Sequence, residues 1–278
     1  MGSVGTTQGG DSKVSHMMEF LKANRFYAGV FTAVLLLSIA LRVMGASSVE
    51  VRSPDERTYA MEASTIVDQG TDGLRGIADH FRKDPSMFAL PSPVRVGYLY
   101  TLAGMMQLTG NKHAEAGAWL SSISSLAALV LLGLLGWRFF SPLTGIAAML
   151  LYAVSPPVMA MARRSWQESF VEMLALLLML LALEAALRQS PTWAAAAGVV
   201  ASFSITVKEI ATIHAACIVL LLVIALLRKK AWTSLGTLTT AIAVTGWICF
   251  AWMSHVFGGV SQVLFFVRQN IATAGNTG

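Results

Sequence analysis

Residues 209–227, EIATIHAACIVLLLVIALL, are the stretch that sets the fold class of this chain. The run is apolar over almost its whole length, and the basic triplet Arg228-Lys229-Lys230 follows it. About 20 such residues in a helix cross the roughly 30 Å of hydrocarbon in a bilayer. A helix also satisfies its own backbone N–H and C=O groups, as a medium without water requires. The run therefore predicts a transmembrane helix.

Apolar runs of similar length recur along the chain. They lie near residues 27–44, 116–137, 142–161, 168–187, 192–207 and 234–254. Of the 278 residues, 55% are hydrophobic and only 13% are charged, whereas about a quarter of a typical soluble domain is charged. The sequence therefore predicts an all-α membrane protein with about seven transmembrane helices.

The segment between the first two runs, residues 45–115, decides the orientation of the rest. It is polar and acidic up to Asp84 and later contains a shorter apolar stretch, residues 94–108. If that stretch lies at the interface, with Tyr98 and Tyr100 at headgroup level, the basic loop residues all fall on one side, as the positive-inside rule requires. If it crosses the membrane, the basic residues split between both faces. The first interpretation is favoured, and it makes this segment a long first outer loop containing juxtamembrane helices.

The favoured topology divides the chain into three parts. Residues 1–26 are expected to form a cytoplasmic, partly disordered N-terminus, residues 27–254 the transmembrane domain, and residues 255–278 an outer-face tail with a turn at Gly258-Gly259. No small-residue cleavage site follows the first apolar run, which is typical of a retained signal anchor. We therefore expect a multi-pass protein of the plasma (inner) membrane.

An acidic pair, Asp55-Glu56, follows Pro54 just beyond the first span. One interpretation is an ordinary helix start, because carboxylates stabilise the N-terminus of a helix and proline is favoured there. The position of the pair close to a span, on the same face as other charges, favours a functional carboxylate.

Two arginines, Arg163 and Arg164, occupy a tight connection between two spans, with Glu168 close behind. Arg164 and Glu168 are spaced to pair across one helical turn. The arginines could simply snorkel at a membrane border. Because the positive-inside rule disfavours arginine on the outer face, anion binding is the better interpretation. One turn further, Glu172 is expected to face the bundle interior.

A second charged connection contains Lys208 and Glu209 and has almost no loop. Lys208 would lie close to the interface, where an ammonium can bind a lipid phosphate as a point charge. The alternative is an internal Lys208–Glu209 pair that ends a helix. Glu184 and Arg188 are also four residues apart, but at the inner end of a span, where we expect a structural pair.

Several classes of function are not supported by the sequence. It contains no P-loop, Rossmann glycine fingerprint, nucleophile elbow or His/Cys metal set. The formal charge of +5 is not gathered in a basic patch with interleaved aromatics, so nucleic acid is not expected. No cofactor is required; the outer carboxylates could bind a divalent metal, but their spacing does not demand one. A phosphate-bearing membrane lipid is the better partner for the basic clusters.

The order and spacing of these motifs resemble the GT-C superfamily of polyprenyl-phosphate-dependent glycosyltransferases, especially the branch with the protein O-mannosyltransferases and the lipid A aminoarabinose transferase. The resemblance extends from the first span to about Leu227. Residues 55–60, DERTYA, resemble the acidic motif of the first outer loop, and residues 90–93 with 98–100 resemble the proline-led juxtamembrane helix. Residues 163–168 and 206–209 resemble the Arg/acidic and Thr/Lys/Glu motifs.

The resemblance implies a role for each of these residues. Asp55 would be the catalytic base and Glu56 would orient acceptor or donor; the lipid phosphate would be held by Arg163, Arg164 and Lys208, with support from Glu168, Glu209 and Tyr59. The donor would be a polyprenyl-phosphate-linked sugar, and the acceptor a hydroxyl of a protein, lipid or glycan on the outer face. Transfer would invert the anomeric carbon, and the cations would stabilise the leaving phosphate.

The chain also departs from that family. The family usually continues for several more spans, so residues 1–278 are expected to correspond to its N-terminal membrane part. The arginine often found at the outer start of the second span is absent, because residues 118–121 read AWLS. The alternative function is a transporter or lipid-handling protein with an anion-binding outer cavity. Transporters usually show internal repeats and polar groups near the midplane, and no repeat is evident here.

Overall fold

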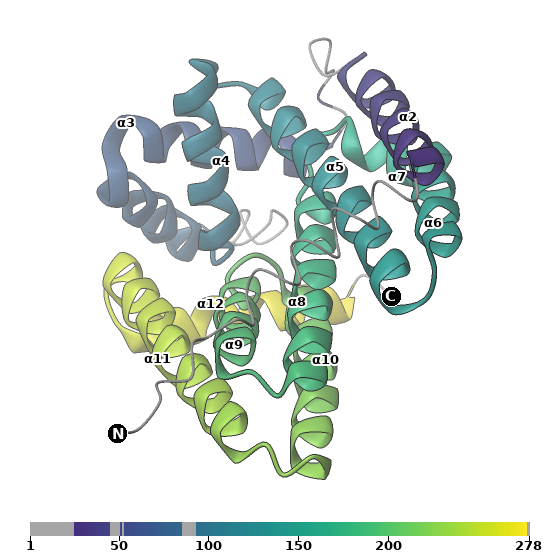
Figure 1. Cartoon of the computed structure of the whole chain (residues 1–278). Helices are drawn as coiled ribbons and strands as arrows, with labels where there is room; N and C mark the ends of the chain where they lie inside the picture. Colours follow the sequence, from purple (N-terminus) through teal and green to yellow (C-terminus); the bar gives the residue numbers. More distant parts are fainter. Residues whose placement is uncertain (1–24, 45–50, 52, 85–92, 277–278) are drawn as a thin grey trace, which may run out of the picture.

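The structure is a computed structural model that describes residues 25–44, 51, 53–84 and 93–276 (Figure 1). Every regular element in these ranges is an α-helix. The helices are α2 (Arg25–Val43), α3 (Pro54–Lys83), α4 (Val96–Thr109), α5 (Ala114–Phe139), α6 (Pro142–Val154), α7 (Pro156–Ala162), α8 (Glu168–Arg188), α9 (Pro191–Ile205), α10 (Glu209–Arg228), α11 (Trp232–Phe257) and α12 (Val260–Asn276). The prediction of an all-α membrane protein is confirmed. Most of the expected N-terminal segment, and residues 90–92 of the proline-led motif, lie outside the described residues.

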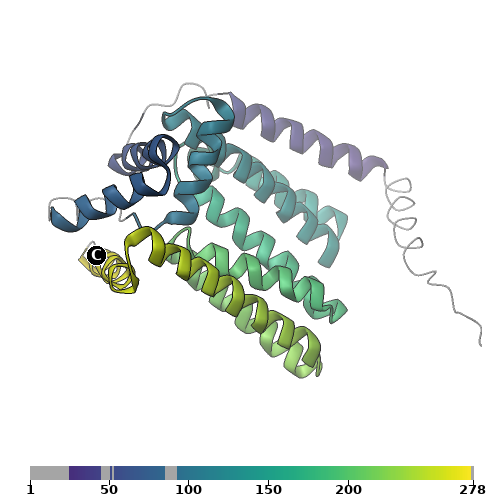
Figure 2. The ribbon, with the colours of Figure 1, turned by 90° about the vertical axis from the view of Figure 1, so that its left-hand side faces the viewer.

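Five of these helices are long and apolar enough to cross a membrane: α2, α5, α8, α10 and α11. They run roughly side by side in Figure 2. Helices α6 and α7 would make a sixth span if they are taken as one, although they are bent by 66°. The chain is therefore a multi-pass integral membrane protein, with five or six spans in the described part where the sequence predicted about seven.

Two of the predicted spans differ from a straight crossing helix for local reasons. Residues 142–161 break at Ser155 because two prolines follow; a residue before proline is pushed to extended backbone, and Ser155 has φ −64° and ψ 118°. Helix α9 has only 15 residues, so at 1.5 Å per residue it is about 22 Å long. That length is shorter than the hydrocarbon core.

Helices α3, α4 and α12 lie together at one end of the spans (Figure 2). The hydroxyl of Ser53 caps α3 by accepting the Glu56 N–H, and Pro54 takes the first helical position. The helix is kinked at Gly70, whose φ of 63° suits a residue without a side chain. The predicted outer loop is thus largely helical.

Helix α4 runs across the direction of the spans, as the interfacial interpretation of residues 94–108 expected (Figure 2). The level of Tyr98 in the membrane stays a prediction, but this side chain is fully buried in protein. Its ring packs against Tyr59 and Phe170, with centroids 5.3 and 6.5 Å away. Tyr100 is partly buried and hydrogen-bonds Thr71 at 3.0 Å. Helix α4 is therefore a packing platform between the spans and α3.

The residues predicted as a tail continue as a helix. Gly258 and Gly259 form the predicted turn, with φ of 78° and 132°, and α12 follows. The guanidinium of Arg75 donates to the His255 carbonyl at 3.0 Å, at the C-terminal end of α11, and the Phe266 ring of α12 packs 5.8 Å from that of Phe81. These contacts join α11 and α12 to α3.

The other end of the spans contains the predicted structural pair. The buried carboxylate of Glu184 accepts from Arg188, as the spacing predicted, and also from the Arg138 Nε at 2.7 Å. The two arginines come from the C-terminal ends of α8 and α5. Basic residues therefore gather at the end of the molecule away from α3 and α4.

Candidate active site

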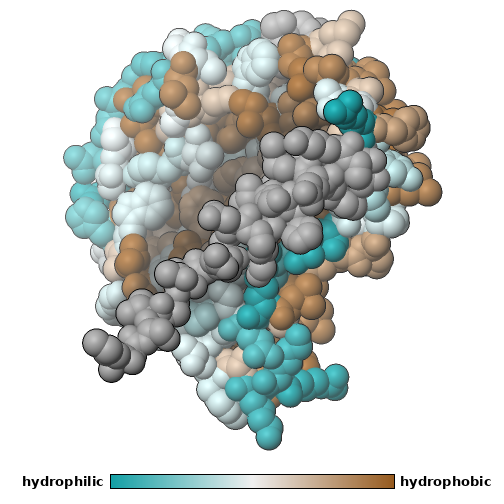
Figure 3. All heavy atoms as spheres, in the orientation of Figure 1, coloured by the Kyte–Doolittle hydropathy of each residue, from teal (hydrophilic) through white to brown (hydrophobic). Residues whose placement is uncertain are grey.

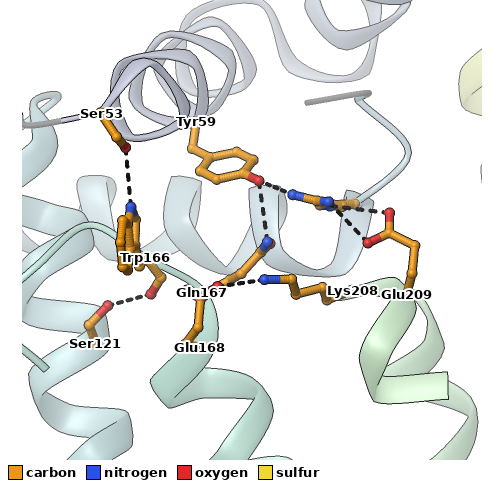
Figure 4. Close-up of polar contacts among 9 residues, drawn as sticks. Ser53, Tyr59, Ser121, Trp166, Gln167, Glu168, Lys208 and Glu209 are labelled. Carbon is orange, nitrogen blue, oxygen red and sulfur yellow. Dashed lines mark hydrogen bonds and ion pairs between the residues drawn. The ribbon is translucent and has the colours of Figure 1, made fainter. Parts of the chain in front are cut away.

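Four segments that are far apart in the sequence meet at the end of the spans covered by α3 and α4. They are residues 53–62 at the start of α3, residues 93–98 at the start of α4, and the two connections 163–168 and 206–209. Figure 4 shows side chains from the start of α3 and from both connections close together with their polar contacts, and Arg95 of the fourth segment bonds Tyr59 and Glu209. The predicted motifs thus converge, and the segment before α4 joins them.

Two glycines allow the connections to approach the helices closely. The Gly97 N–H donates to the Thr206 carbonyl at 2.9 Å, and a Cβ at Gly97 would fall 2.2 Å from the Thr206 hydroxyl. A Cβ at Gly117 in α5 would likewise fall 1.8 Å from the Ser165 hydroxyl. A larger residue at either position would push a charged connection out of place.

The connection 163–168 is not helical, and this changes the predicted pairing. Helix α7 ends at Ala162 and α8 begins at Glu168, so Arg164 does not sit one helical turn from Glu168. Instead Arg164 Nε donates to Glu56 Oε1 at 2.5 Å. Its guanidinium also lies over the Trp166 ring, 3.7 Å from the centroid, a cation–π contact. The predicted Arg164–Glu168 pair is therefore wrong, and Arg164 binds the acidic motif.

The neighbouring Arg163 points to a different part of the molecule. Its guanidinium donates through two nitrogens to the Leu41 carbonyl, with Nε at 3.0 Å. Leu41 lies in the last turn of α2, where carbonyls lack intrahelical partners. Arg163 thus ties α2 to the connection, and its role in phosphate binding stays a prediction.

Lys208 and Glu209 are adjacent in the sequence but pair with different elements. Lys208 Nζ donates to Glu168 Oε1 at 2.5 Å, and Glu209 accepts two hydrogen bonds from Arg95 at 3.0 and 3.3 Å. The alternative considered above, an internal Lys208–Glu209 pair, is therefore not formed. The two ion pairs link α10 to α8 and to the start of α4.

Arg95 is the residue of this polar cluster that sequence reasoning missed. It directly precedes α4, and its Nη1 donates to the hydroxyl of the buried Tyr59, which also accepts from Gln167 Nε2 at 3.2 Å. The available signal was an arginine on the predicted outer face immediately before an apolar helix, the argument already applied to Arg163 and Arg164. Tyr59, predicted as a supporting residue, is the centre of the network.

The acidic pair is split between two environments. Glu56 is fully buried and bound by Arg164, whereas Asp55 is exposed on the first turn of α3. Further along the same helix, Glu62 is also buried, and burial raises its pKa to about 8 although Arg95 opposes the shift. Burial likewise raises the pKa of Tyr59, so its hydroxyl stays protonated at neutral pH. Asp55 is therefore the accessible carboxylate of the motif.

An apolar groove of about 560 Å³ begins at the Lys208–Glu168 pair and continues between α8 and α10. Its deeper lining includes Leu176 and Ile218, with His214 on α10. Glu172 also lines it and accepts a hydrogen bond from the Tyr152 hydroxyl at 2.7 Å. A charged mouth above an apolar channel suits an amphiphile with an anionic head.

Within the described residues, no three His, Cys, Asp or Glu side chains are close enough together to hold a metal ion. Three carboxylates at the site have cationic partners: Glu56, Glu168 and Glu209 bind Arg164, Lys208 and Arg95. The guanidinium and ammonium groups of these pairs are the donors that this end of the spans offers to an anionic group.

The fold and the site together define a multi-pass helical membrane protein with an acidic and basic site at one end of its spans. A model of the family described as dolichyl-phosphate-mannose-protein mannosyltransferase matches residues 93–253, more than half of the chain. The chain belongs to this family and is a membrane glycosyltransferase of the GT-C superfamily. The match contains Arg95 and both charged connections and begins after the acidic motif. Comparisons with curated proteins and with solved structures each found no match.

Proposed function

We propose that this protein transfers a mannosyl group from a polyprenyl-phosphate donor to a hydroxyl group of a protein on the outer membrane face, with inversion and with Asp55 as the base. The observation that carries the proposal is the convergence of three cation–carboxylate pairs at one end of the spans, one of which forms the mouth of an apolar groove. The sugar and the protein acceptor follow the description of the family. The groove and its charges suit the lipid donor.

The donor would lie with its isoprenoid chain between α8 and α10 and its phosphate at the mouth of the groove. Lys208 is the cation of that mouth, and it is 22% exposed beside a Glu168 that is 38% exposed. A phosphate can therefore reach the ammonium without leaving the lipid. Arg95 and Arg164 belong to the other two ion pairs at this end of the spans and would add fixed positive charge as the phosphate departs.

The transfer itself is a single displacement. The acceptor oxygen forms a bond to the anomeric carbon while the bond from that carbon to the phosphate oxygen breaks, and its electron pair stays on the phosphate. Asp55 takes the proton of the acceptor hydroxyl. Its exposure on the first turn of α3 supports this role, because the acceptor must approach from outside, whereas Glu56 is engaged by Arg164.

The positions of the basic residues support a topology with the N-terminus in the cytoplasm and the site on the outer face of the plasma (inner) membrane. The site lies at the N-terminal ends of α8 and α10, while Arg188 and residues 228–230 lie at or beyond their C-terminal ends. Under the positive-inside rule the C-terminal ends of α8 and α10 face the cytoplasm.

The test is transfer of labelled mannose from polyprenyl-phosphate mannose to an acceptor peptide in membranes that contain the full chain. We expect Asp55→Asn to lower the rate by about 10²-fold or more, the usual loss for a general base. Lys208→Gln should lower it by about 10²-fold because charge on the leaving phosphate is no longer stabilised. Expression and thermal unfolding must be equal among the variants compared.

Matched controls exist on exposed parts of the same layer. Asp72→Asn removes a carboxylate of α3 whose side chain is 86% exposed, and Lys112→Gln removes a lysine that is 49% exposed. Both should transfer mannose at the wild-type rate. A wild-type chain that binds the donor but never transfers it would contradict the enzymatic proposal and favour a lipid-handling protein.

A further inference from the structure

Glu62 is a buried carboxyl group that the proposed reaction does not use. It lies in α3, one turn beyond Tyr59, with 2% of its surface exposed. Its Oε2 atom has no hydrogen-bond partner among the described residues. Buried polar atoms in native proteins nearly always have a partner, so a lone carboxyl oxygen requires an explanation.

Arg95, the cation whose charge acts on Glu62, has its donors occupied elsewhere. The Nε and Nη2 atoms of Arg95 donate hydrogen bonds to Glu209, and Nη1 donates one to the Tyr59 hydroxyl. None of these hydrogen bonds goes to Glu62. Even so, the positive charge of Arg95 acts on Glu62 and lowers its pKa, although burial raises it more. Glu62 and Glu209 are therefore two carboxyl groups beside one guanidinium, and only one of them is bound.

The other ionisable groups around Glu62 do not offer a second cation. Tyr59 precedes it on α3, and the buried Tyr98 faces that tyrosine from α4. Exposed Asp55 lies one turn before Tyr59. The titratable groups at the start of α5 border a separate groove; they are Lys112, His113 and Glu115, with Arg57 and Asp68 from α3 itself. Arg95 is thus the cation through which Glu62 can act.

We propose that Glu62 is a positioning residue that acts through Arg95: as a neutral acid it leaves Arg95 oriented toward Glu209 and Tyr59, and as a carboxylate it draws Arg95 toward α3. This inference rests on the proposed function, in which Arg95 contributes positive charge to the donor phosphate. An ionised Glu62 would withdraw that charge and add a negative one beside an anionic ligand. The neutral acid is therefore the form that admits the donor.

The first measurement needs no donor: the thermal unfolding midpoint of the full chain in detergent, from pH 6 to pH 9. The pKa of Glu62 is about 8 in the folded protein and 4.5 in the reference state. Between these values the folded chain holds one more proton than the unfolded chain, so stability falls as the pH rises toward 8. Glu62→Gln, which has the same shape and no charge, should remove this part of the fall; Asp72→Asn should leave it unchanged.

The second measurement is binding of polyprenyl-phosphate mannose, a phosphodiester whose charge is constant over this pH range. If only the acid form binds well, the wild-type dissociation constant rises about tenfold between pH 7 and pH 9, following the protonated fraction. In Glu62→Gln it should stay constant, and the KM for the donor in the transfer assay should follow the same pattern while kcat changes little.

The outcomes separate the two proposals. Loss of the stability slope in Glu62→Gln with an unchanged pH profile of binding would mean that Glu62 is only a buried structural acid, which overturns the inference. Binding with the expected profile but without transfer would support the inference and count against the enzymatic function. A wild-type chain that binds no donor at any pH would overturn both.

Discussion

The three ion pairs of the site differ in how far they lie from solvent, and this decides what each contributes. Glu56 is fully buried against Arg164, whereas Glu168 and Glu209 remain 38% and 44% exposed in their pairs with Lys208 and Arg95. An exposed pair adds little to stability, while the loss of one partner from a buried pair is costly. The Arg164–Glu56 pair is therefore the structural one of the three.

This difference predicts losses of stability of different size for two substitutions. Arg164→Met should lower the free energy of unfolding by about 3 kcal/mol, because the buried Glu56 carboxylate loses its guanidinium. Lys208→Met should lower it by about 1 kcal/mol or less, because water can solvate Glu168. Denaturant titration of both variants in detergent measures the difference, and equal losses would contradict this ranking.

Arg95→Lys tests whether the shape of the guanidinium matters as well as its charge. The forked group serves Glu209 and Tyr59 at once, and a single ammonium cannot reproduce that geometry. We expect the transfer rate at low donor concentration to fall at least tenfold, roughly the effect of losing one charged hydrogen bond. Arg82→Lys is the control, since Arg82 pairs within α3 with the half-exposed Asp79. Equal rates for Arg95→Lys and wild type would show that only the charge is used.

At the scale of the elements, a backbone hydrogen bond holds the start of α4 against the 206–209 connection. The Gly97 N–H to Thr206 carbonyl bond allows no room for a side chain at this position. The same contact sets the distance between Arg95 and Glu209, which lie on its two sides. The docking of α4 is therefore part of the site.

Two glycines of α4 form a matched pair for testing this contact. A Cβ at Gly97 would fall 2.2 Å from the Thr206 hydroxyl, whereas a Cβ at Gly104 would meet no atom within 4 Å. Gly97→Ala should destabilise the protein by about 1–3 kcal/mol through overpacking and should also lower transfer. Gly104→Ala should be neutral or stabilising by up to about 1 kcal/mol, because alanine favours the helix. Unfolding midpoints and transfer rates of the two variants test whether the close contact at Gly97 is needed for stability and for transfer.

The connections between helices are where sequence reasoning erred, for a shared physical reason. The spacing of Arg164 and Glu168 gives a pair only if the backbone between them is helical, but the Trp166 carbonyl accepts from Ser121 at 2.6 Å and Trp166 Nε1 donates to Ser53 at 3.2 Å. These contacts from α5 and from the start of α3 hold the segment in a non-helical conformation. Local spacing carries no information about such distant partners.

At the scale of the whole molecule, charge is divided between the two ends of the spans. One end has the mixed acidic and basic site beneath α3 and α4, and the other has the Arg138–Glu184–Arg188 cluster. Large apolar side chains such as Leu221 and Trp247 are exposed on the spans, and the space-filling view shows hydrophobic patches beside hydrophilic ones on the face that it draws (Figure 3). This is the surface expected where lipid replaces water around the spans.

The topology can be tested with single cysteines in a chain whose Cys217 and Cys249 are replaced by alanine. A membrane-impermeant maleimide should label Lys112→Cys, beside α4, in intact cells. It should label Lys230→Cys, between α10 and α11, only after permeabilisation, because the proposed topology places the basic end in the cytoplasm. The opposite pattern would place the site in the cytoplasm and contradict a donor used on the outer face.

The sequence by itself determined the helical membrane class, the approximate position of each span and the segments that carry charge, because these depend on local hydropathy and on the length a helix needs to cross a bilayer. Only the tertiary structure decided which charges meet. In the folded chain Asp55 is exposed while Glu56 is buried, and Arg163 bonds the last turn of α2. Folding also places Arg95 and the buried Glu62 beside the predicted motifs. Ion pairs between residues more than 100 positions apart, such as Arg164 with Glu56, depend on how helices pack and not on spacing along the chain.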